Sequence, residues 1–247
     1  MEAWSDGLVT ARNEWAPGLF TLRIEAEIEP FSAGQFTNLG LWQGEHFLRR
    51  SYSMASAPGQ PLEFFITRVA GGALTPLLLE VPIGGTIHVE RKPQGFFTLA
   101  FVPPARDLWL VATGTGLGPF IAILRTQEPW QRFERIVVAH GVREREQLAY
   151  RDELLGMSAA HENRLIWVPV VSREPNVPDV VHGRVTSALR DGSLERGAGL
   201  ELSPDRSHLM LCGNPAMIAE LSELLGERGL RKHRVRKPGH ISTEKYW

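Results

Sequence analysis

Arg50-Ser51-Tyr52-Ser53 follows an apolar run and precedes a turn signal, Ala57-Pro58-Gly59. Arginine carries a planar fork of donors that suits a phosphate, and an aromatic residue two positions later lies on the same face of a strand. The serine hydroxyl that follows can hydrogen-bond the polar edge of a ring. These residue types favour a flat cofactor that carries phosphate, such as a flavin nucleotide. The alternative is an ordinary edge strand with a solvated arginine and a packed tyrosine.

Short strand-like runs separated by turn signals lie on both sides of this stretch. Such spacing predicts a closed antiparallel barrel. The six runs are Gly7–Asn13, Leu19–Ala26, Gln35–Leu41, Phe47–Met54, Leu62–Val69 and Thr86–Arg91. The pattern breaks at Gly71–Leu79, where glycines lead into a short apolar helix that begins near Thr75-Pro76. The start of that helix either binds an anion through its N–H groups or simply covers one end of the barrel.

The sequence changes character after Pro93–Pro104, a segment with three prolines that we interpret as a linker. Beyond it, continuous apolar runs of strand length alternate with helical patterns, which predicts a parallel sheet covered on both faces. The strands are expected at Leu108–Ala112, Ile136–His140, Leu165–Val170 and Leu209–Cys212, and the helices at Pro119–Thr126, Gln147–Met157 and Pro215–Arg228. We therefore predict two domains, residues 1–100 and residues 101–247.

Open parallel sheets bind ligands at the carboxyl ends of their strands, and suitable residues occur there. The glycines of Thr113–Pro119 let the backbone approach a pyrophosphate, although a glycine-rich turn after a strand is common. Two strands end near Arg143 and near Ser172-Arg173, and Arg184 lies just beyond. If these side chains converge, they suit the 2′-phosphate that distinguishes NADP from NAD. The alternative is that they are solvated surface residues.

Cys212-Gly213-Asn214-Pro215 ends the fourth of these strands. A cysteine at a strand end is most often a small buried hydrophobic residue. Beside a nicotinamide, its small and polarisable side chain would instead border the path of hydride transfer.

Composition excludes several classes of function. The 247 residues are 43% hydrophobic and 22% charged, as in a globular protein. No apolar run is long enough for membrane insertion, and the net charge of −1 gives no case for nucleic-acid binding. One cysteine, Cys212, excludes an internal disulfide and a cysteine-ligated iron–sulfur cluster within the chain, and we expect no metal. The first residues lack the pattern of a secretory signal, so we expect a cytoplasmic location.

Arg50–Ser53, the Gly114–Gly118 turn, Cys212–Pro215 and the terminal Tyr246-Trp247 together resemble the ferredoxin/flavodoxin–NADP reductases. The nearest resemblance is to the short bacterial type that ends in Tyr-Trp, and it covers essentially the whole chain. It implies a flavin barrel followed by a nucleotide-binding α/β domain, with noncovalent FAD and NADP(H). The implied reaction is hydride transfer from NADPH to flavin N5, followed by single-electron transfer to ferredoxin or flavodoxin.

The resemblance also implies which residues hold the cofactors. They are Arg50, Ser51, Tyr52, Ser53, Phe65, Ile66, Thr67, Arg68, Ala73, Leu74, Thr75, Thr115, Arg143, Ser172, Arg173, Arg184, Asn214, Pro215, Tyr246 and Trp247. The residues implied at the reaction itself are Ser53 near flavin N5, Cys212 on the nicotinamide side and Glu244. The short bacterial tail differs from plant-type members around Glu244, which leaves the role of that residue open.

Two features near the C-terminus each allow more than one interpretation. Arg231–Lys237 is a run of basic residues that either attracts an acidic protein partner or is simply solvated. Tyr246-Trp247 either packs on the flavin, at its isoalloxazine or its adenine, or packs on the seam between the domains.

Two rival functions stay open. We expect the chain to be a monomer. One is the reductase subunit of an oxygenase system, which often carries an additional cluster domain that this chain lacks. The other is a non-catalytic nucleotide-binding module, which would need neither the Arg-x-Tyr-Ser strand nor an aromatic tail.

Overall fold

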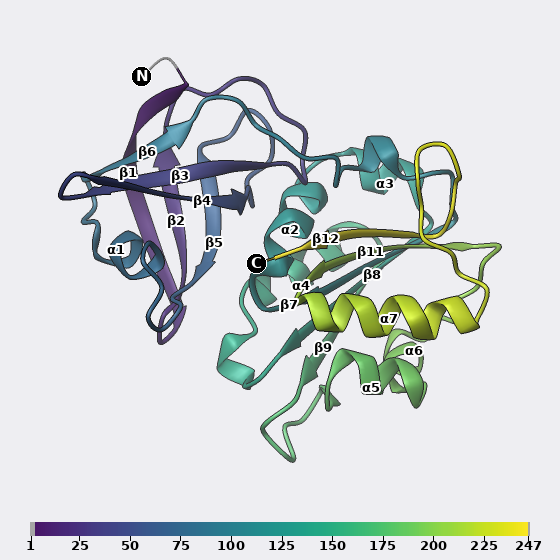
Figure 1. Cartoon of the computed structure of the whole chain (residues 1–247). Helices are drawn as coiled ribbons and strands as arrows, with labels where there is room; N and C mark the ends of the chain where they lie inside the picture. The colour runs from purple at the N-terminus through teal and green to yellow at the C-terminus, as the bar shows by residue number, and fades with distance from the viewer. Residues whose placement is uncertain (1–2, 247) are drawn as a thin grey trace. The chain divides into compact units, whose positions relative to one another are not determined.

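The computed structural model describes residues 3–246, and their contacts divide the chain into two units. The first unit comprises the residues up to Leu99 together with Gly118–Thr126. The second comprises Ala100–Leu117 and the residues from Gln127 onward. Each unit is built on one six-stranded sheet (Figure 1).

The sheet of the first unit is antiparallel throughout. Its strands are β1 (Trp4–Ala16), β2 (Leu19–Glu25), β3 (Phe36–Gln43), β4 (His46–Ser53), β5 (Leu62–Thr67) and β6 (Thr86–Glu90), in the spatial order β4-β3-β6-β1-β2-β5. The expected antiparallel fold is confirmed, but the ladder of strand pairs does not close into a complete barrel. Within the described residues, the two edge strands β4 and β5 are connected by the isolated bridge between Met54 and Phe64, just beyond the end of β4 at Ser53, rather than by a continuous ladder.

Alternating apolar residues form the core of this unit. On β2, Phe20, Leu22 and Ile24 are fully buried, whereas Arg23 between them is exposed, as expected for a strand with one face on the core. The short helix α1 (Thr75–Glu80) starts at the predicted position, with Pro76 in its first turn and Leu78 buried. Helix α2 (Gly118–Leu124) also belongs to this unit, and the ring of Phe120 lies 5.8 Å from that of Phe97.

The sheet of the second unit is parallel throughout. Its strands are β7 (Asp107–Thr113), β8 (Arg135–Val142), β9 (Leu165–Val171), β10 (Val181–His182), β11 (Ser207–Gly213) and β12 (Ile241–Lys245), in the order β10-β9-β8-β7-β11-β12. The chain starts at β7, proceeds outward through β8, β9 and β10, and then returns to the other side of β7 to form β11 and β12. The order therefore reverses at β7, and the carboxyl ends of strands beside such a reversal are the usual ligand site of an open sheet.

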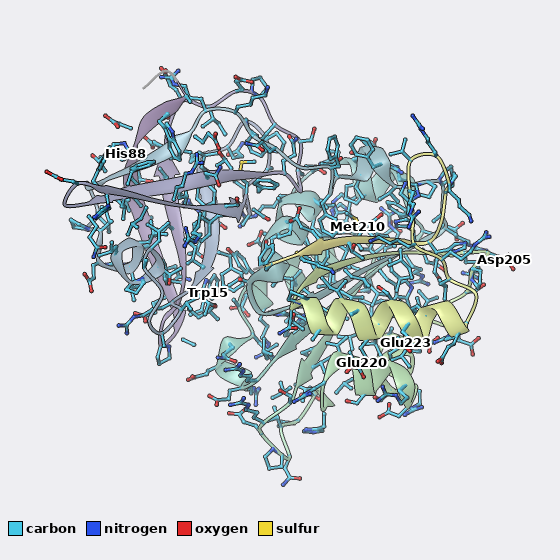
Figure 2. All side chains as sticks on the ribbon, in the orientation of Figure 1. Trp15, His88, Asp205, Met210, Glu220 and Glu223 are labelled. Atoms are coloured by element: carbon cyan, nitrogen blue, oxygen red, sulfur yellow. The ribbon has the colours of Figure 1, made fainter. Side chains whose placement is uncertain are left out.

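In the described part of the second unit, five α-helices accompany this sheet. They are α3 (Glu128–Arg132), α4 (Arg151–Ala160), α5 (Val185–Arg190), α6 (Ser193–Ala198) and α7 (Pro215–Glu227). Buried residues of α5, α6 and α7 share one hydrophobic cluster with β7, β8, β9 and β11. Figure 2 labels Glu220 on α7, whose Oε1 lies 2.6 Å from Nη2 of Arg190 at the end of α5. The near-continuous apolar strands and their helical cover agree with the predicted α/β sheet.

The structure corrects several details of the sequence prediction. Strands β10 and β12 were not expected, and each is an edge strand, β10 being only two residues long. The helix predicted at Gln147–Met157 begins later, at Arg151, because Tyr150 adopts a left-handed conformation with φ 59°. The segment Pro93–Pro104, interpreted above as a linker, contains a short 3-10 helix, Leu99–Phe101, and the side chains of Phe97 and Leu99 are buried.

Two observations bear on the classes of function considered above. Within residues 3–246, no helix is both long and apolar enough to cross a membrane. In the same residues, no three side chains of His, Cys, Asp or Glu gather as a metal site would require.

Candidate functional site

The stretch Arg50–Ser53 forms the last four residues of β4 and pairs with β3. The Ser51 hydroxyl donates to Oδ1 of Asn38 across the strand pair at 2.7 Å. The Asn38 amide in turn donates to the Glu90 carboxylate on β6. This network holds three neighbouring strands in register, so Ser51 supports the strand that carries Arg50 and Tyr52.

Arg50 and Tyr52 lie on one face of β4, since they are two residues apart on a strand. Burial raises the pKa of Tyr52 to about 12, and the Arg50 guanidinium lowers it by a smaller amount. The phenol is therefore neutral at physiological pH and able to donate a hydrogen bond. Arg50 itself is exposed, and its Nη1 donates to the Arg49 carbonyl at 2.7 Å. Ser53, at the end of the strand, is buried.

The other predicted flavin-binding segments of the first unit lie on β5 or after it, and β5 is bridged to the residue that follows β4. The Met54–Phe64 bridge joins that end to β5 and places Phe65 and Ile66 next along the chain, both buried. The backbone N–H of Val69 then donates to Oγ1 of Thr75 at 2.8 Å. This bond ties the segment Phe65–Arg68 to Ala73–Thr75. Within the latter, Leu74 is 3% exposed and packs in the core, so it offers a ligand only its backbone.

The glycine turn of the second unit follows β7 as a 3-10 helix, Gly114–Leu117. Gly114 has φ +53°, and a Cβ added to it would meet no atom within 4 Å, so this residue borders open space. Gly116 has no such space, because a Cβ there would lie 2.5 Å from the Cys212 carbonyl oxygen. The turn is thus packed tightly against β11 at Gly116 and open at Gly114, as a turn that receives a ligand requires. Thr115, between them, is buried.

A pocket of about 340 Å³ lies at the carboxyl ends of β9 and β10. Its lining residues are Val171, Ser172, Arg173, Glu174, Pro175, Asn176, His182 and Gly183. Arg143, at the end of β8, accepts a hydrogen bond on its carbonyl from the Arg173 N–H at 2.8 Å, and Arg184 follows the lining residue Gly183. The structure therefore gathers the four predicted phosphate-binding residues around adjacent strand ends, and all four are exposed.

Cys212, Glu244 and Tyr246 lie together at the carboxyl ends of β11 and β12. Cys212 and Glu244 are paired in register, and the Tyr246 N–H donates to the Gly213 carbonyl at 3.0 Å. Cys212 is fully buried, and this burial, reinforced by the Glu244 carboxylate, raises the pKa of its thiol well above the usual value. The thiol is therefore neutral at physiological pH. Trp247, the last residue of the predicted tail, lies outside the described residues.

Asn214 and Pro215 begin α7. The side-chain oxygen of Asn214 accepts hydrogen bonds from the N–H groups of Ala216 at 2.8 Å and Met217 at 3.3 Å, and Pro215 occupies the first turn. These are the features of a helix N-cap. The backbone N–H of Asn214 also donates to Oγ1 of Thr113 at 3.0 Å. Both residues thus have a structural role in joining β7, β11 and α7.

Comparison with known proteins gives consistent results over the whole chain. The model of the oxidoreductase NAD-binding domain family matches residues 110–223, which include the glycine turn and the Ser172 pocket. The flavodoxin/ferredoxin–NADP reductase of Escherichia coli (strain K12) is 38% identical over 249 residues, covering 100% of both chains. The ferredoxin–NADP reductase of Pseudomonas aeruginosa is 34% identical, covering 98% of this chain and 93% of the relative. The chain belongs to the ferredoxin/flavodoxin–NADP reductase family.

A solved structure of the same family agrees in fold. The ferredoxin NADP⁺ reductase of Neisseria gonorrhoeae, determined with bound FAD and NADP, superimposes with a TM-score of 0.93 at 31% identity, covering 99% of each chain. The family resemblance drawn from the Arg50–Ser53, glycine-turn and Cys212 motifs is thereby confirmed. The antiparallel-then-parallel order of the two sheets is the order of that relative.

Sequence reasoning missed several residues that the structure places at this family's candidate site. Glu174, Asn176 and His182 line the pocket beside Ser172. His140, at the end of β8, is fully buried, with Nε2 3.1 Å from the Gly114 carbonyl oxygen. The strand-end rule could have indicated His140, because it lies in a predicted strand just before Gly141. His182 gave no comparable signal, because a two-residue strand has no recognisable pattern.

Proposed function

We propose that this chain is a flavoprotein oxidoreductase that transfers electrons between NADPH and a ferredoxin or flavodoxin through FAD. Full-length similarity to named reductases of this family is the observation that carries the proposal. It is supported by the exposed arginines gathered at the carboxyl ends of the second sheet. In this proposal residues 1–100 bind FAD, and residues 101–247 bind NADP(H).

The first unit offers donors and an aromatic surface that fit FAD. The exposed guanidinium of Arg50 suits the pyrophosphate, and backbone N–H groups of Ala73–Thr75 suit the same group. Tyr52 provides a half-buried ring on the same face as Arg50, on which the isoalloxazine would lie, with Ser53 near N5. The flank of the ring would be lined by Phe65, Ile66, Thr67 and Arg68.

The second unit offers a corresponding set of residues that fit NADP(H). The glycine turn that starts at Gly114 suits the pyrophosphate, because its open side lets the backbone approach closely. Ser172 and Arg173 line a pocket, with Arg143 and Arg184 beside it, and this cluster of donors suits the 2′-phosphate. Asn214 and Pro215 would hold the nicotinamide end from the adjacent strand.

The chain contributes position and electrostatics to the reaction. When bound, FAD accepts a hydride at N5 and releases single electrons, which is chemistry of the cofactor. Cys212 provides a neutral and compact wall on the nicotinamide side, since its buried thiol resists ionisation. Glu244 lies next to it and places a carboxylate at the same strand ends. Tyr246 and Trp247 would pack on the flavin, at its isoalloxazine or at its adenine.

A comparison of NADPH with NADH as the electron donor tests the proposed 2′-phosphate site. Replacing both Arg173 and Arg184 by Ala is expected to raise the KM for NADPH far more than the KM for NADH, because only NADPH carries the 2′-phosphate. Steady-state reduction of an artificial acceptor with each nucleotide measures both constants. A matched control replaces Arg196 and Arg151, which are exposed on the same unit and do not line the pocket. A wild-type protein that uses both nucleotides equally well would contradict the 2′-phosphate assignment.

The full activity has a direct test. The purified protein should be yellow, and NADPH should reduce an added ferredoxin or flavodoxin only in the presence of the enzyme. A colourless protein that neither binds FAD nor oxidises NADPH would overturn the proposal and favour a non-catalytic nucleotide-binding module.

A further inference from the structure

The glycine turn after β7 is held from both neighbouring strands. On the β11 side, Oγ1 of Thr113 accepts from the Asn214 N–H at 3.0 Å, and Gly116 packs against the Cys212 carbonyl. On the β8 side, Nε2 of His140 lies 3.1 Å from the Gly114 carbonyl oxygen. The β8 contact is the only one of these that comes from a side chain able to change its protonation state near neutral pH.

The environment of His140 fixes its chemical form. The side chain is fully buried, and this burial lowers its pKa to about 4, so the ring is neutral at physiological pH. A carbonyl oxygen can only accept, so the proton of the neutral ring lies on Nε2 and is donated to Gly114. Within the described residues, Nδ1 has no hydrogen-bond partner. A buried polar nitrogen without a partner is unfavourable by about 1–3 kcal/mol relative to an apolar side chain, and so its presence calls for an explanation.

We propose that His140 is a positioning residue for NADP(H): its Nε2–H holds the Gly114 carbonyl toward the sheet and thereby turns the Thr115 N–H toward the pyrophosphate. The reason is the geometry of the peptide unit. The C=O of Gly114 and the N–H of Thr115 belong to one planar trans peptide, in which they point in opposite directions. Fixing the carbonyl therefore fixes the amide. The inference rests on the proposed function, in which this turn binds the pyrophosphate.

The surroundings of Gly114 support this role. Because Gly114 has a positive φ and its α-carbon borders open space, packing does not confine the backbone on that side of the 3-10 helix Gly114–Leu117. The His140 hydrogen bond adds a restraint to those made within this short helix. A neutral donor suits the task, because a buried cation at this position would require its own counter-charge.

Two substitutions of His140 by an amide residue test whether the hydrogen bond to Gly114, rather than a polar side chain as such, is required. In His140→Gln the amide nitrogen occupies nearly the place of histidine Nε2, whereas in His140→Asn it corresponds to Nδ1 and falls short of the Gly114 carbonyl. We expect NADP⁺ to bind His140→Asn about tenfold more weakly than the wild type, which is the typical effect of one hydrogen bond. His140→Gln should bind within about twofold of the wild type if the hydrogen bond is what matters.

Adenosine 2′-monophosphate provides the control ligand, because it carries the 2′-phosphate but no pyrophosphate. Calorimetric titration should give the same Kd for this ligand in wild type and both His140 variants. Arg173→Ala, in contrast, should weaken both ligands. Equal weakening of NADP⁺ and adenosine 2′-monophosphate in His140→Asn would mean general disruption and would overturn the inference, as would an unchanged Kd for NADP⁺.

The same titrations distinguish this inference from the proposed function. A wild-type protein that binds neither ligand contradicts the proposed function, whereas normal NADP⁺ binding by His140→Asn contradicts only the role of His140. Nitrogen-15 NMR of the wild type provides a measurement that needs no variant to fold. The ring of His140 should be the neutral tautomer protonated at Nε2, and a proton found on Nδ1 would refute the proposal.

Discussion

Two neighbouring arginines on β4 face different environments. Arg50 lies on the same side of the strand as Tyr52, whose pKa responds to its charge, whereas Arg49 lies on the opposite side. Both side chains are exposed and carry the same charge. They therefore form a matched pair in which only the direction of the side chain differs.

Arg50→Ala is expected to weaken FAD binding. A charge-assisted hydrogen bond to phosphate contributes roughly 1.5–3 kcal/mol, so the Kd for FAD should rise by about 10- to 150-fold. Fluorescence of released FAD on dilution measures the change. Arg49→Ala should retain FAD like the wild type, and equal effects of the two substitutions would argue that only the net charge of β4 matters.

The histidine His208, on β11, should make folding stability depend on pH. Burial, with smaller contributions from His233 and His240, lowers the pKa of His208 to about 3, and Nε2 lies 2.9 Å from Oγ of Ser242. The folded pKa lies below the unfolded one, so the unfolded state binds the proton more readily. This contribution to stability is complete above about pH 6.5 and is lost as the pH falls toward 3.

We expect the free energy of unfolding of the wild type to fall by up to about 1.4 kcal/mol per pH unit more steeply than that of His208→Gln, between pH 6 and pH 4. Urea denaturation at several pH values gives both curves. Parallel curves would show that His208 titrates normally in the folded protein.

At the scale of helices and strands, the elements with a strong local sequence pattern could be predicted, and those with a weak pattern could not. The strands around Arg50 and the apolar strands β7, β8, β9 and β11 have clear alternation or continuous apolar runs, and the sequence indicated each of them. Strand β12 is Ile-Ser-Thr-Glu-Lys, with one buried apolar residue, Ile241, so its place depends on pairing with β11 rather than on its own pattern. The site followed the same rule. The strand-end residues Ser172 and Arg173 were indicated, but the contact between His140 and Gly114 depends on the register of β7 and β8, which sequence alone does not fix.

Helix α2 is anchored in the first unit by a buried ion pair just beyond its last residue. Nη1 of Arg125 lies 2.9 Å from Oε1 of Glu63 on β5 and donates to the Ala55 carbonyl at 2.9 Å. The Glu63 side chain is 6% exposed, and its other oxygen, Oε2, lies 3.2 Å from Nη2 of Arg23. Two arginines thus share one buried carboxylate.

Arg125→Ala is expected to destabilise the protein by about 1–3 kcal/mol, because Glu63 would keep its burial and lose one of its charged partners. Chemical denaturation followed by fluorescence measures the change. Glu27→Ala is the control, since that carboxylate is mostly exposed in its ion pair with Arg91 and its loss should have little effect. A wild-type denaturation midpoint for Arg125→Ala would mean that Glu63 does not need Arg125 as a partner.

At the scale of the whole molecule, positive charge is concentrated in one loop despite a net charge of −1. The basic loop, Arg231–Lys237, carries five exposed cationic side chains, and backbone hydrogen bonds between Arg234 and Lys237 close its tip. Its base is held by the ring nitrogen of His240, which accepts from the Arg231 N–H at 3.0 Å. The loop therefore presents its charges from a defined backbone.

Reduction of an acidic carrier by NADPH is expected to slow as ionic strength rises, when measured below saturation, because salt screens the attraction between the basic loop and the carrier. Replacing Arg234, Arg236 and Lys237 by Gln should reduce this dependence on salt. Replacing three exposed arginines elsewhere on the second unit, Arg135, Arg151 and Arg196, should change it less. Identical salt dependence in the two triple variants would show that the basic loop is only a solvated surface run.

The composition of the first unit has a consequence for biosynthesis. A ribosome that has released residues up to Leu99 has not yet made Phe120, which packs on Phe97, or Arg125, which pairs with Glu63. Strand β7, a part of the other unit, must be translated before these residues appear. The first unit therefore cannot complete its packing until the first strand of the second unit has been translated. A gene truncated at codon 100 would encode the sheet of the first unit without α2.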